Sequence, residues 1–540
     1  MSEATKPDGE RRKFRAIKGT RDILPPDSAL WNWFEKTARG VMEVYNFAEI
    51  RTPIFEETEL FARSIGAETD VVKKEMYSFE DHDLLEMEQH RAALVLSRPS
   101  VDRIAEFTFY ERNAQSYSER LEGYIAKGEA PKTPENLRAI SVIRECLHHM
   151  NSFVRQFVFE QSSSAREGFE HYSNGIVSAL RSVDLGDVLT LRPEATASVV
   201  RAYIEHGMHT RPGDQKLYYV GPMFRRERPQ KGRYRQFYQI GAEVLGTSDA
   251  PAIDAELIEM LTVLLERCQI EKYTLLINSI GCPDTPERKG CRPKYVELLR
   301  AELRKPEIYE RLGADSKRRV ETNPLRVMDS KLPEEQEIIE KKLPKISEHL
   351  CADCKAHYEN LKKELMLREV PFTESPRLVR GLDYYMRTTF EITSPILGAQ
   401  NALCGGGRYD GLVEMLGGPK GIKGIGFALG EDRFIDAIVE AKKINATRAV
   451  DVFIAWMGER AYPTAVRLAH VLRGEKHTVE LPPEEMKFRK ALERADKMGA
   501  RYVLIIGDDE IASDMLTIKR LADGKQEKIA EGALLGYIKR

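Results

Sequence analysis

Five arginine residues lie close together between Tyr218 and Gly246, in a stretch that could bind the phosphates of a nucleoside triphosphate. Each guanidinium group stays charged and binds two oxygen atoms at once through its planar fork. The alternative is a basic hairpin exposed to solvent, because the spacing matches neither a P-loop nor a dinucleotide fingerprint. The residues are Arg225, Arg226, Arg228, Arg233 and Arg235.

The segments on both sides of these arginines have the composition of strands. Apolar residues alternate from Tyr238 to Val244, which places them on one face of a strand and leaves Gln239 and Glu243 on the other. We therefore expect a hairpin with one buried face and one face that carries polar groups toward a ligand.

Strand and helix signals also occur earlier in the chain. Asp27 or Ser28 is expected to cap a helix that runs toward Tyr45. The sequence FAEIRTPIFEE then reads as a strand that Pro53 interrupts, so an edge position or a subunit contact is expected for it. Residues 188–207 read as a strand that passes directly into a helix near Thr196, a junction whose polar groups often face a pocket.

Length and composition indicate a globular protein of several domains. The chain has 540 residues, of which 42% are hydrophobic and 31% charged, enough for three or four domains. The net charge of −2 gives no overall field that would attract a polyanion, so such a partner must meet local basic patches. No signal peptide and no membrane-spanning segment is expected, which favours the cytoplasm and no membrane partner.

Seven cysteines, without an export signal, are expected to be reduced thiols. Cys351 and Cys354 have the spacing of metal ligands, and Cys282 and Cys291 could complete a set of four. The eight residues between Cys282 and Cys291 exceed the usual spacing, and sequence alone does not bring the two pairs together. We therefore expect isolated thiols and no zinc or other metal bound by protein side chains.

Several strings resemble the histidyl-tRNA synthetase family of class II aminoacyl-tRNA synthetases. They are TLRPEAT, GPMFRRERPQKGRYRQFYQIGAEVLG, LVRGLDYYMRT, GGGRYDGLV and GIGFALGEDRF. The resemblance covers residues 14–83 and 188–540. It implies an α+β fold in which helices flank a six-stranded antiparallel sheet, with a small C-terminal α/β anticodon-binding domain. It further implies a homodimer that activates L-histidine with ATP and transfers histidine to tRNA-His.

The resemblance also assigns the residues that would bind ATP. Arg225 and Arg380 would act as catalytic residues that hold the α-phosphate from opposite sides, Arg380 in place of a metal ion that other class II enzymes use. Glu227 and Arg233 would border the loop over ATP, and Arg433 would hold the terminal phosphates and stack on adenine. Fixed guanidinium groups suit this chemistry, because negative charge builds on the phosphate oxygens when the carboxylate attacks phosphorus. Mg²⁺ is expected to accompany ATP.

A second group of residues would bind histidine. Glu243 and Tyr385 would read the two nitrogens of the imidazole, which offers one donor and one acceptor when neutral. The other members would surround the α-amino group, line the walls or touch the carboxylate; they are Glu194, Ala195, Thr196, Gln239, Arg380, Tyr384 and Tyr409. The glycines from Gly405 to Gly407 are explained either by close approach to a ligand or by a tight turn.

The domain organisation follows from where the resemblance holds. Residues 1–83, 188–271 and 377–441 would form the catalytic core, 272–376 the family's insertion domain and 449–540 the anticodon-binding domain. Residues 84–187 would be an additional helical insertion, with a helix that Thr133 caps just before Pro134. Ala195 and Met386 stand where the family usually has glycine and asparagine, so nearby contacts could differ.

Two other functional classes compete with the enzyme. A catalytically inactive relative could sense histidine as a regulatory subunit, but such proteins typically lose the ATP arginines and the C-terminal domain. A general RNA-binding protein would have no need of Glu243 and Tyr385 beside Gln239. The arginines at 225, 380 and 433 favour the ligase.

Overall fold

The computed structural model describes residues 14–66, 69, 71–80, 85–97, 104–127, 132–160, 163–183, 188–230, 232–286, 288–379, 382, 384–441 and 450–538. The chain divides into two compact units. One comprises the residues up to 22 together with 35–444, and the other comprises 23–34 together with the residues from 445 onward. No helix in the described ranges is long and apolar enough to cross a membrane.

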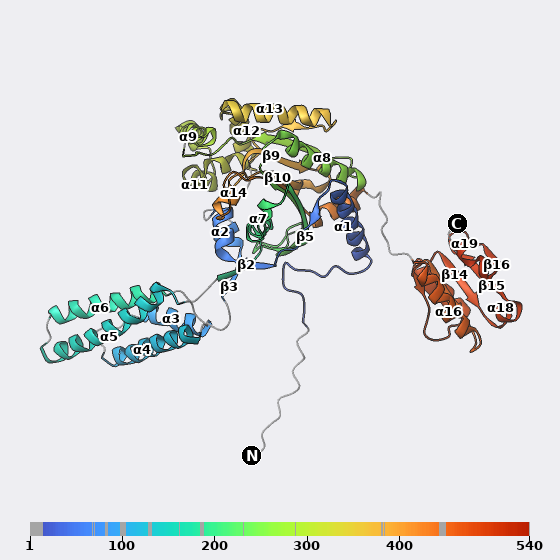
Figure 1. Cartoon of the computed structure of the whole chain (residues 1–540), viewed down its shortest axis with the longest axis horizontal. Helices are drawn as coiled ribbons and strands as arrows, with labels where there is room; N and C mark the ends of the chain where they lie inside the picture. Colours follow the sequence, from blue (N-terminus) through green and yellow to red (C-terminus); the bar gives the residue numbers. More distant parts are fainter. Residues whose placement is uncertain are drawn as a thin grey trace, which may run out of the picture. The chain divides into compact units, whose positions relative to one another are not determined.

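An eight-stranded sheet forms the centre of the first unit (Figure 1). From edge to edge its strands are β1 (Ala48–Glu49), β5 (Gln215–Phe224), β6 (Gln236–Gly246), β11 (Lys423–Gly430), β10 (Ala402–Arg408), β9 (Met386–Thr393), β7 (Thr274–Ser279) and β8 (Thr373–Glu374). The six strands from β5 to β7 pair antiparallel, and only the two-residue edge strands β1 and β8 pair parallel. The expected six-stranded antiparallel sheet is therefore confirmed.

Helices cover this sheet and bury its apolar residues. On β6 the apolar face of Ile240, Ala242 and Val244 is buried as expected. The opposite face is buried as well from Gly241 onward, so burial does not alternate along this part of the strand. Among the helices described are α1 (Asp27–Val44), α2 (Thr58–Ile65), α7 (Thr196–Glu205), α8 (Pro251–Arg267), α14 (Leu412–Met415) and α15 (Glu431–Ala441). Val199 and Tyr203 of α7 join the same buried cluster as strand residues of β5 and β6.

The chain changes sheets at Pro53. Residues 48–57 form two short strands, β1 in the main sheet and β2 (Phe55–Glu57) in a three-stranded sheet of order β2-β4-β3. The other two strands of that sheet are β3 (Tyr77–Glu80) and β4 (Val188–Leu191). Both β1 and β2 are edge strands, which confirms the edge position expected from a proline that cannot donate a ladder hydrogen bond.

Four helices separate β3 from β4 along the chain: α3 (Leu85–Leu96), α4 (Ile104–Lys127), α5 (Pro134–Glu160) and α6 (Ser163–Arg181) (Figure 1). They bury an apolar core of their own, which includes Phe107, Ile143 and Phe169. The backbone N–H of Asn136 donates a 3.1 Å hydrogen bond to Oγ1 of Thr133, so the predicted cap is confirmed. The additional segment is thus a helix bundle inserted into a β-hairpin.

A second set of helices lies between β7 and β8. It consists of α9 (Cys291–Leu303), α10 (Pro306–Tyr309), α11 (Ala314–Thr322), α12 (Pro333–Lys341) and α13 (Ala352–Leu367). β7 and β8 themselves pair within the main sheet, although both fall inside the 272–376 insertion expected from sequence. The helical part of that segment is therefore shorter, because Thr274–Ser279 forms a strand of the main sheet.

The second unit contains an α/β domain with a five-stranded sheet of order β13-β12-β14-β15-β16. Its elements are β12 (Val452–Trp456), α16 (Ala461–Gly474), β13 (Val479–Glu480), α17 (Phe488–Lys497), β14 (Tyr502–Ile506), α18 (Asp508–Ser513), β15 (Met515–Arg520), β16 (Gln526–Ala530) and α19 (Leu534–Ile538). Ala465, Leu468 and Leu472 of α16 are buried against the sheet, as their helical spacing predicts.

Candidate active site

A cavity of about 290 Å³ lies against β6, β9, β10 and β11, near the lower end of the size range of small-molecule sites. Its walls include the loop after β5, the residues before β9 and the start of α15. The predicted site residues among the lining are Glu194, Thr196, Arg225, Glu227, Arg233, Gln239, Tyr384, Tyr385 and Arg433. Segments separated by more than 200 residues thus meet around one space.

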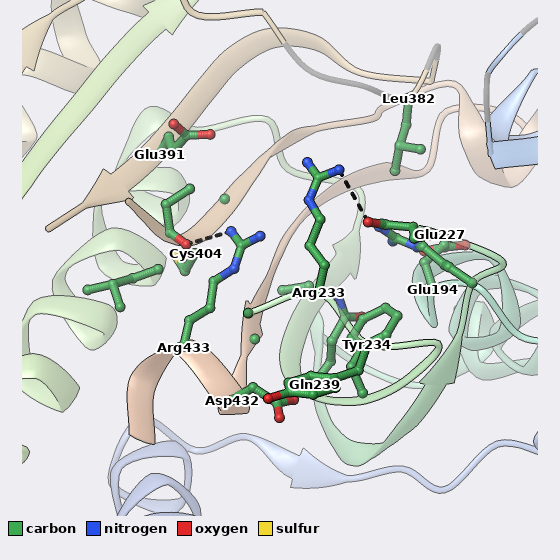
Figure 2. A pocket seen from close by; sticks show the side chains of 18 of the residues that line it. Glu194, Glu227, Arg233, Tyr234, Gln239, Leu382, Glu391, Cys404, Asp432 and Arg433 are labelled. Carbon is green, nitrogen blue, oxygen red and sulfur yellow. Dashed lines mark hydrogen bonds and ion pairs between the residues drawn. The ribbon is translucent and has the colours of Figure 1, made fainter. Parts of the chain in front are cut away.

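Three guanidinium groups, together with Glu227, line the side of the cavity expected to bind ATP. Arg225 donates to the carbonyl of Pro193 at 2.9 Å. Glu227 pairs with Arg233 at 3.3 Å, and Figure 2 shows this pair beside Arg433, whose side chain also extends into the cavity. Glu194, Glu391 and Asp432 also line the cavity, and Asp432 pairs with Arg21. The three guanidinium groups are the cavity's means of binding phosphate oxygens.

Arg433 is held in place at the start of α15. Its Nη1 donates to the carbonyl of Ala402 on the neighbouring β10 at 2.9 Å, as the dashed line in Figure 2 marks. Burial, followed by the positive charge of Arg233, lowers the pKa of Arg433. The direction of this shift means that an anion in the cavity would stabilise the charged form of the side chain.

The acceptor groups expected around an α-amino group lie on the other side of the cavity. Glu194 accepts hydrogen bonds from the backbone N–H groups of Thr196 at 2.7 Å and Ala197 at 3.0 Å, and so it caps the first turn of α7. This structural role of Glu194 was not expected from sequence. Gln239 has a buried Oε1 for which the described residues provide no hydrogen-bond partner, and its side chain lines the cavity.

Glu243 and Tyr409 lie deeper than expected. They are absent from the described residues that line the cavity, as is the buried Ala195. Glu243 accepts a 2.7 Å hydrogen bond from the hydroxyl of Thr196 and another from the hydroxyl of Tyr409. Burial raises the pKa of Glu243 to about 8, and these two hydrogen bonds oppose the shift only in part.

Two tyrosines connect this buried carboxyl to the cavity wall. The Tyr384 ring lies 5.7 Å from that of Tyr409 in an edge-on arrangement and 4.6 Å from that of Tyr385. Tyr384 and Tyr385 both line the cavity, whereas Tyr409 contacts Glu243. The residues expected to bind the substrate histidine therefore form a continuous layer from the cavity to the interior.

The glycines of β10 serve strand packing, which neither sequence interpretation described. A Cβ at Gly406 would lie 2.3 Å from the carbonyl oxygen of Gly426, and one at Gly407 would lie 2.5 Å from that of Thr388. Both residues sit inside a strand, so a tight turn is the wrong explanation. Of these three glycines, Gly405 lines the cavity.

Arg21 is a site residue that the sequence analysis missed. It pairs with Asp432 and donates to the hydroxyl of Tyr234 at 2.9 Å, and both partners line the cavity. Nearby, the backbone N–H of Arg235 donates to the carbonyl of Gly19 at 2.7 Å. Residues 19–21 thus tie the loop between β5 and β6 to the start of α15, and the string GTRD was the signal that could have indicated it.

Other lining residues also escaped the sequence analysis. Phe237 follows the same alternation as Gln239 on β6, and its ring lies 5.2 Å from the guanidinium carbon of Arg225. The remaining ones include Leu382, Glu391, Leu403 and Cys404, which come from β9, β10 and the segment before them. Arg380, the second residue predicted to be catalytic, lies outside the described residues.

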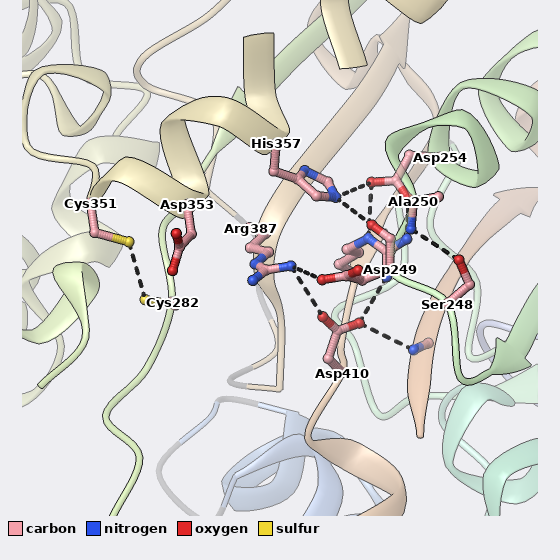
Figure 3. A network of polar contacts seen from close by, with 12 residues as sticks. Ser248, Asp249, Ala250, Asp254, Cys282, Cys351, Asp353, His357, Arg387 and Asp410 are labelled. Atoms are coloured by element: carbon pink, nitrogen blue, oxygen red, sulfur yellow. Dashed lines mark hydrogen bonds and ion pairs between the residues drawn. The ribbon is translucent and has the colours of Figure 1, made fainter. Parts of the chain in front are cut away.

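A buried ionic network joins β10 to helices α8 and α13 (Figure 3). Arg408 binds Asp254 at 2.6 Å and 3.1 Å and Asp410 at 2.9 Å, and both Arg408 and Asp254 are almost fully buried. His357 of α13 lies 3.8 Å from Asp254, and burial lowers the pKa of this histidine. The network fixes the backbone on both sides of Tyr409.

The four cysteines from the insertion meet in space, so the expectation of isolated thiols is wrong. The sulfur atoms of Cys282, Cys291, Cys351 and Cys354 all lie within 4.8 Å of one another. Figure 3 shows the contact between Cys282 and Cys351. The loop between Cys282 and Cys291 folds back on itself, which removes the objection based on their wide spacing.

Comparisons with known proteins agree with this architecture. Residues 152–433 match the family model of histidyl-tRNA synthetase, and residues 451–540 match that of the anticodon binding domain. The chain is 42% identical over 530 residues to the histidine–tRNA ligase of Koribacter versatilis, covering 97% of this chain and 96% of the relative. It is also 42% identical over 516 residues to that of Solibacter usitatus, covering 96% of each.

A solved structure gives the same result. The apo histidyl-tRNA synthetase of S. aureus is 30% identical, with a TM-score of 0.63 and coverage of 98% of this chain and 100% of the other. The matched regions contain both the cavity and the C-terminal α/β domain. The chain therefore belongs to the histidyl-tRNA synthetase family of class II aminoacyl-tRNA synthetases.

Proposed function

We propose that this cavity holds ATP and L-histidine together while the chain makes histidyl-adenylate, the first half of the histidine–tRNA ligase reaction. The observation that carries the proposal is that Arg225, Arg233 and Arg433 line the same cavity as the unpartnered amide oxygen of Gln239. Cations for phosphates and an acceptor for an ammonium group are what the two substrates need.

In the proposed reaction, a carboxylate oxygen of histidine forms a bond to the α-phosphorus of ATP while the bond to pyrophosphate breaks. Arg225 stabilises the negative charge that builds on the α-phosphate oxygens, and it does so without moving because Pro193 already positions its side chain. Arg433 holds the departing phosphates. The assignment of Arg380 to the opposite side of the α-phosphate rests on the resemblance of RGLDYY alone.

In the second half, a hydroxyl at the 3′ end of tRNA-His attacks the histidyl carbonyl carbon and AMP leaves. The ligase uses ATP, histidine and tRNA-His as substrates, and the second unit contains the anticodon binding domain. Because tRNA charging serves translation, we infer that the chain acts in the cytoplasm.

For histidine recognition we propose that Glu243 acts with Tyr385. The carboxyl of Glu243 is almost fully buried, so its hydrogen bond with an imidazole N–H would be strong. An analogue that lacks this donor would leave the buried carboxyl without that partner and would bind more weakly. Thr196 and Tyr409 hold the carboxyl in position through their hydroxyls. Glu194, Thr196 and Gln239 would accept hydrogen bonds from the α-ammonium group.

Mg²⁺ is proposed to enter with the phosphates. This ion usually keeps several waters and takes only one or two carboxylates from the protein. Glu227 and Glu391 are carboxylates that line the cavity and could supply them. The ion would neutralise part of the phosphate charge; positioning the α-phosphate remains the task of Arg225.

We also propose a homodimer that uses the region around Pro53. Ile54, Phe55 and Phe79 are large apolar residues that stay between 42% and 48% exposed on or beside the short sheet. Phe55 and Phe79 lie on β2 and β3, the two edge strands of that sheet, and exposed apolar residues on edge strands are typical of a protein contact. Phe55→Asp should shift the molecular mass in solution toward a monomer, whereas Phe109→Asp, at an exposed site on α4, should leave it unchanged.

Histidine-dependent exchange of pyrophosphate into ATP tests the proposed site. Arg225→Ala should lower the exchange rate by roughly a hundredfold or more, the loss seen when one stabilising donor is removed. Arg228→Ala is the matched control, because Arg228 is an exposed arginine in the same loop. Wild-type exchange in Arg225→Ala would overturn the assigned role, and no exchange in the unaltered chain would favour a histidine-sensing regulator instead.

A further inference from the structure

We propose that Cys282, Cys291, Cys351 and Cys354 form a structural site for one Zn²⁺ ion. Their four sulfur atoms lie within 4.8 Å of one another. Zinc binds four thiolates in a tetrahedron with Zn–S bonds of about 2.3 Å, which sets neighbouring sulfur atoms about 3.8 Å apart. The sulfur of Cys282 lies 3.7 Å from that of Cys291 and 3.9 Å from that of Cys351.

The chain builds the first half of this site with a closed loop. The backbone N–H of Thr285 donates to the carbonyl of Arg288 at 2.9 Å, and that of Arg292 donates to the carbonyl of Cys282 at 3.0 Å. These contacts fold the loop so that Cys282 and Cys291 meet, in spite of the eight residues between them. The carboxylate of Asp284 also accepts from the N–H of Gly290 at 2.7 Å.

Glycine is needed at both ends of this loop. Gly281 has a φ of 70°, and a Cβ there would lie 2.7 Å from the sulfur of Cys291. A Cβ at Gly290 would lie 2.2 Å from the carbonyl oxygen of Pro283. The residue before each cysteine of this pair is thus one that lets the two sulfur atoms approach closely.

Helix α13 supplies the second half. Cys351 occupies the N-cap position and Cys354 lies in the first turn, so the two-residue spacing points both sulfur atoms to the same side. Cys291 is the first residue of α9. Backbone N–H groups at the start of a helix stabilise negative charge, and the N–H of Cys282 also donates to the sulfur of Cys291 at 3.3 Å. Such surroundings favour the thiolates that zinc requires.

The site would be closed and structural, not catalytic. Cys282, Cys291 and Cys354 are buried, and four protein ligands leave no position for water or substrate. A disulfide is a different arrangement, because its sulfur atoms are bonded at about 2.05 Å. Iron is the other ion that takes four thiolates in this geometry, and metal analysis separates it from zinc.

The cluster also adjoins the histidine side of the cavity. Met386, one of the two departures from the usual family sequence, packs against the cysteines at the start of β9. Arg292, next to Cys291, donates a hydrogen bond to the carbonyl of Tyr385. A bound ion would therefore hold the segment that carries Tyr384 and Tyr385 and fasten α9 and α13 to it.

Metal content and a cobalt spectrum test the proposal on the full chain. The purified protein should contain about one zinc ion per chain, and Co²⁺ added after chelation should give the absorption bands of a tetrahedral thiolate site. A protein that holds less than about a tenth of an ion and takes up neither Zn²⁺ nor Co²⁺ would overturn the proposal, as would stoichiometric iron.

One substitution separates loss of metal from loss of folding. Cys351→Ser removes a ligand but places a preferred N-cap residue at the start of α13, so the helix should still form. Zinc affinity should fall by more than about a hundredfold, because altering groups that only support a ligand already costs 10–100-fold. Cys146→Ala, at a buried cysteine within the α3–α6 bundle, should keep its zinc. Unchanged zinc affinity in a folded Cys351→Ser variant would contradict the assignment.

Discussion

The hydroxyl of Tyr409 donates a 2.5 Å hydrogen bond to Oε2 of Glu243, and the hydroxyl of Thr196 donates to the other oxygen of the same carboxyl. Tyr409 and Glu243 are almost fully buried, and only Thr196 of the three lines the cavity. The group proposed to read the imidazole is thus already oriented before a ligand arrives, which limits the ordering that binding must pay for.

Glu243 should make the stability of the chain depend on pH. Its pKa is raised from 4.5 to about 8, so the folded chain keeps the proton that the unfolded chain releases. The resulting stabilisation is complete below the ordinary pKa and is lost as the pH rises through about 8. As the pH rises from about 5 to about 8.5, the melting temperature of the wild type should therefore fall relative to that of Glu243→Gln. The same dependence of melting temperature on pH in both proteins would show that Glu243 does not titrate in this way.

Removing Arg21 should weaken ATP binding more than histidine binding. Arg21 holds Tyr234 and Asp432, and loss of a hydrogen bond to a charged group costs about 1.5–3 kcal/mol. We expect Arg21→Ala to raise the KM for ATP in pyrophosphate exchange about tenfold to a hundredfold, with little change in the KM for histidine. Arg15→Ala, at an exposed arginine of the same segment, is the control. An unchanged KM for ATP would show that the contacts of Arg21 with Tyr234 and Asp432 do not support ATP binding.

The buried pair of Arg408 and Asp254 should be costly to break from one side. Arg408→Met leaves the fully buried Asp254 carboxylate without its partner and should lower the free energy of unfolding by about 3–5 kcal/mol. Arg304→Met removes an arginine from an exposed pair with Glu321 and should lower the free energy of unfolding far less, because solvent screens exposed charges. Urea unfolding of the two variants checks this contrast. Equal losses of unfolding free energy in the two variants would mean that burial does not make the ion pair more costly to break.

The helix bundle should be removable without loss of histidine activation. Glu80 on β3 pairs directly with Val188 on β4, so the two ends of the inserted segment are neighbours in a hairpin. Replacing residues 81–187 with Asn-Gly should restore a short hairpin and keep pyrophosphate exchange within about threefold of wild type. A folded deletion variant without exchange would show that the bundle supports the cavity.

The same variant also bears on tRNA. Unchanged charging of tRNA-His would rule out an essential role of the bundle in aminoacylation. Retained exchange with lost charging would assign the bundle to the tRNA step, because exchange reports only the formation of the adenylate.

Local patterns in the sequence determined a large part of the fold and of the site. The alternation along β6 placed Gln239 and Glu243 on the face opposite Ile240, and the structure buries that apolar face. Thr133 was recognised as a helix cap from its immediate neighbours. The strings around Arg225 and Arg433 indicated one cavity before any distance was known. These patterns could be read from the sequence because each depends on residues that are close together in the chain.

Contacts between distant segments were decided only by the tertiary structure. The four cysteines converge because the loop after β7 closes and the start of α13 meets it, 60 residues later in the sequence. Arg21 reaches Asp432 across more than 400 residues, and Glu194 caps a helix although it reads as a substrate ligand. No periodicity or spacing in the sequence predicts these contacts, because they follow from how the whole chain packs. The sequence by itself thus determined the family and the residue types of the active site, and the packing of distant segments determined the buried partners of Glu243 and the cysteine cluster.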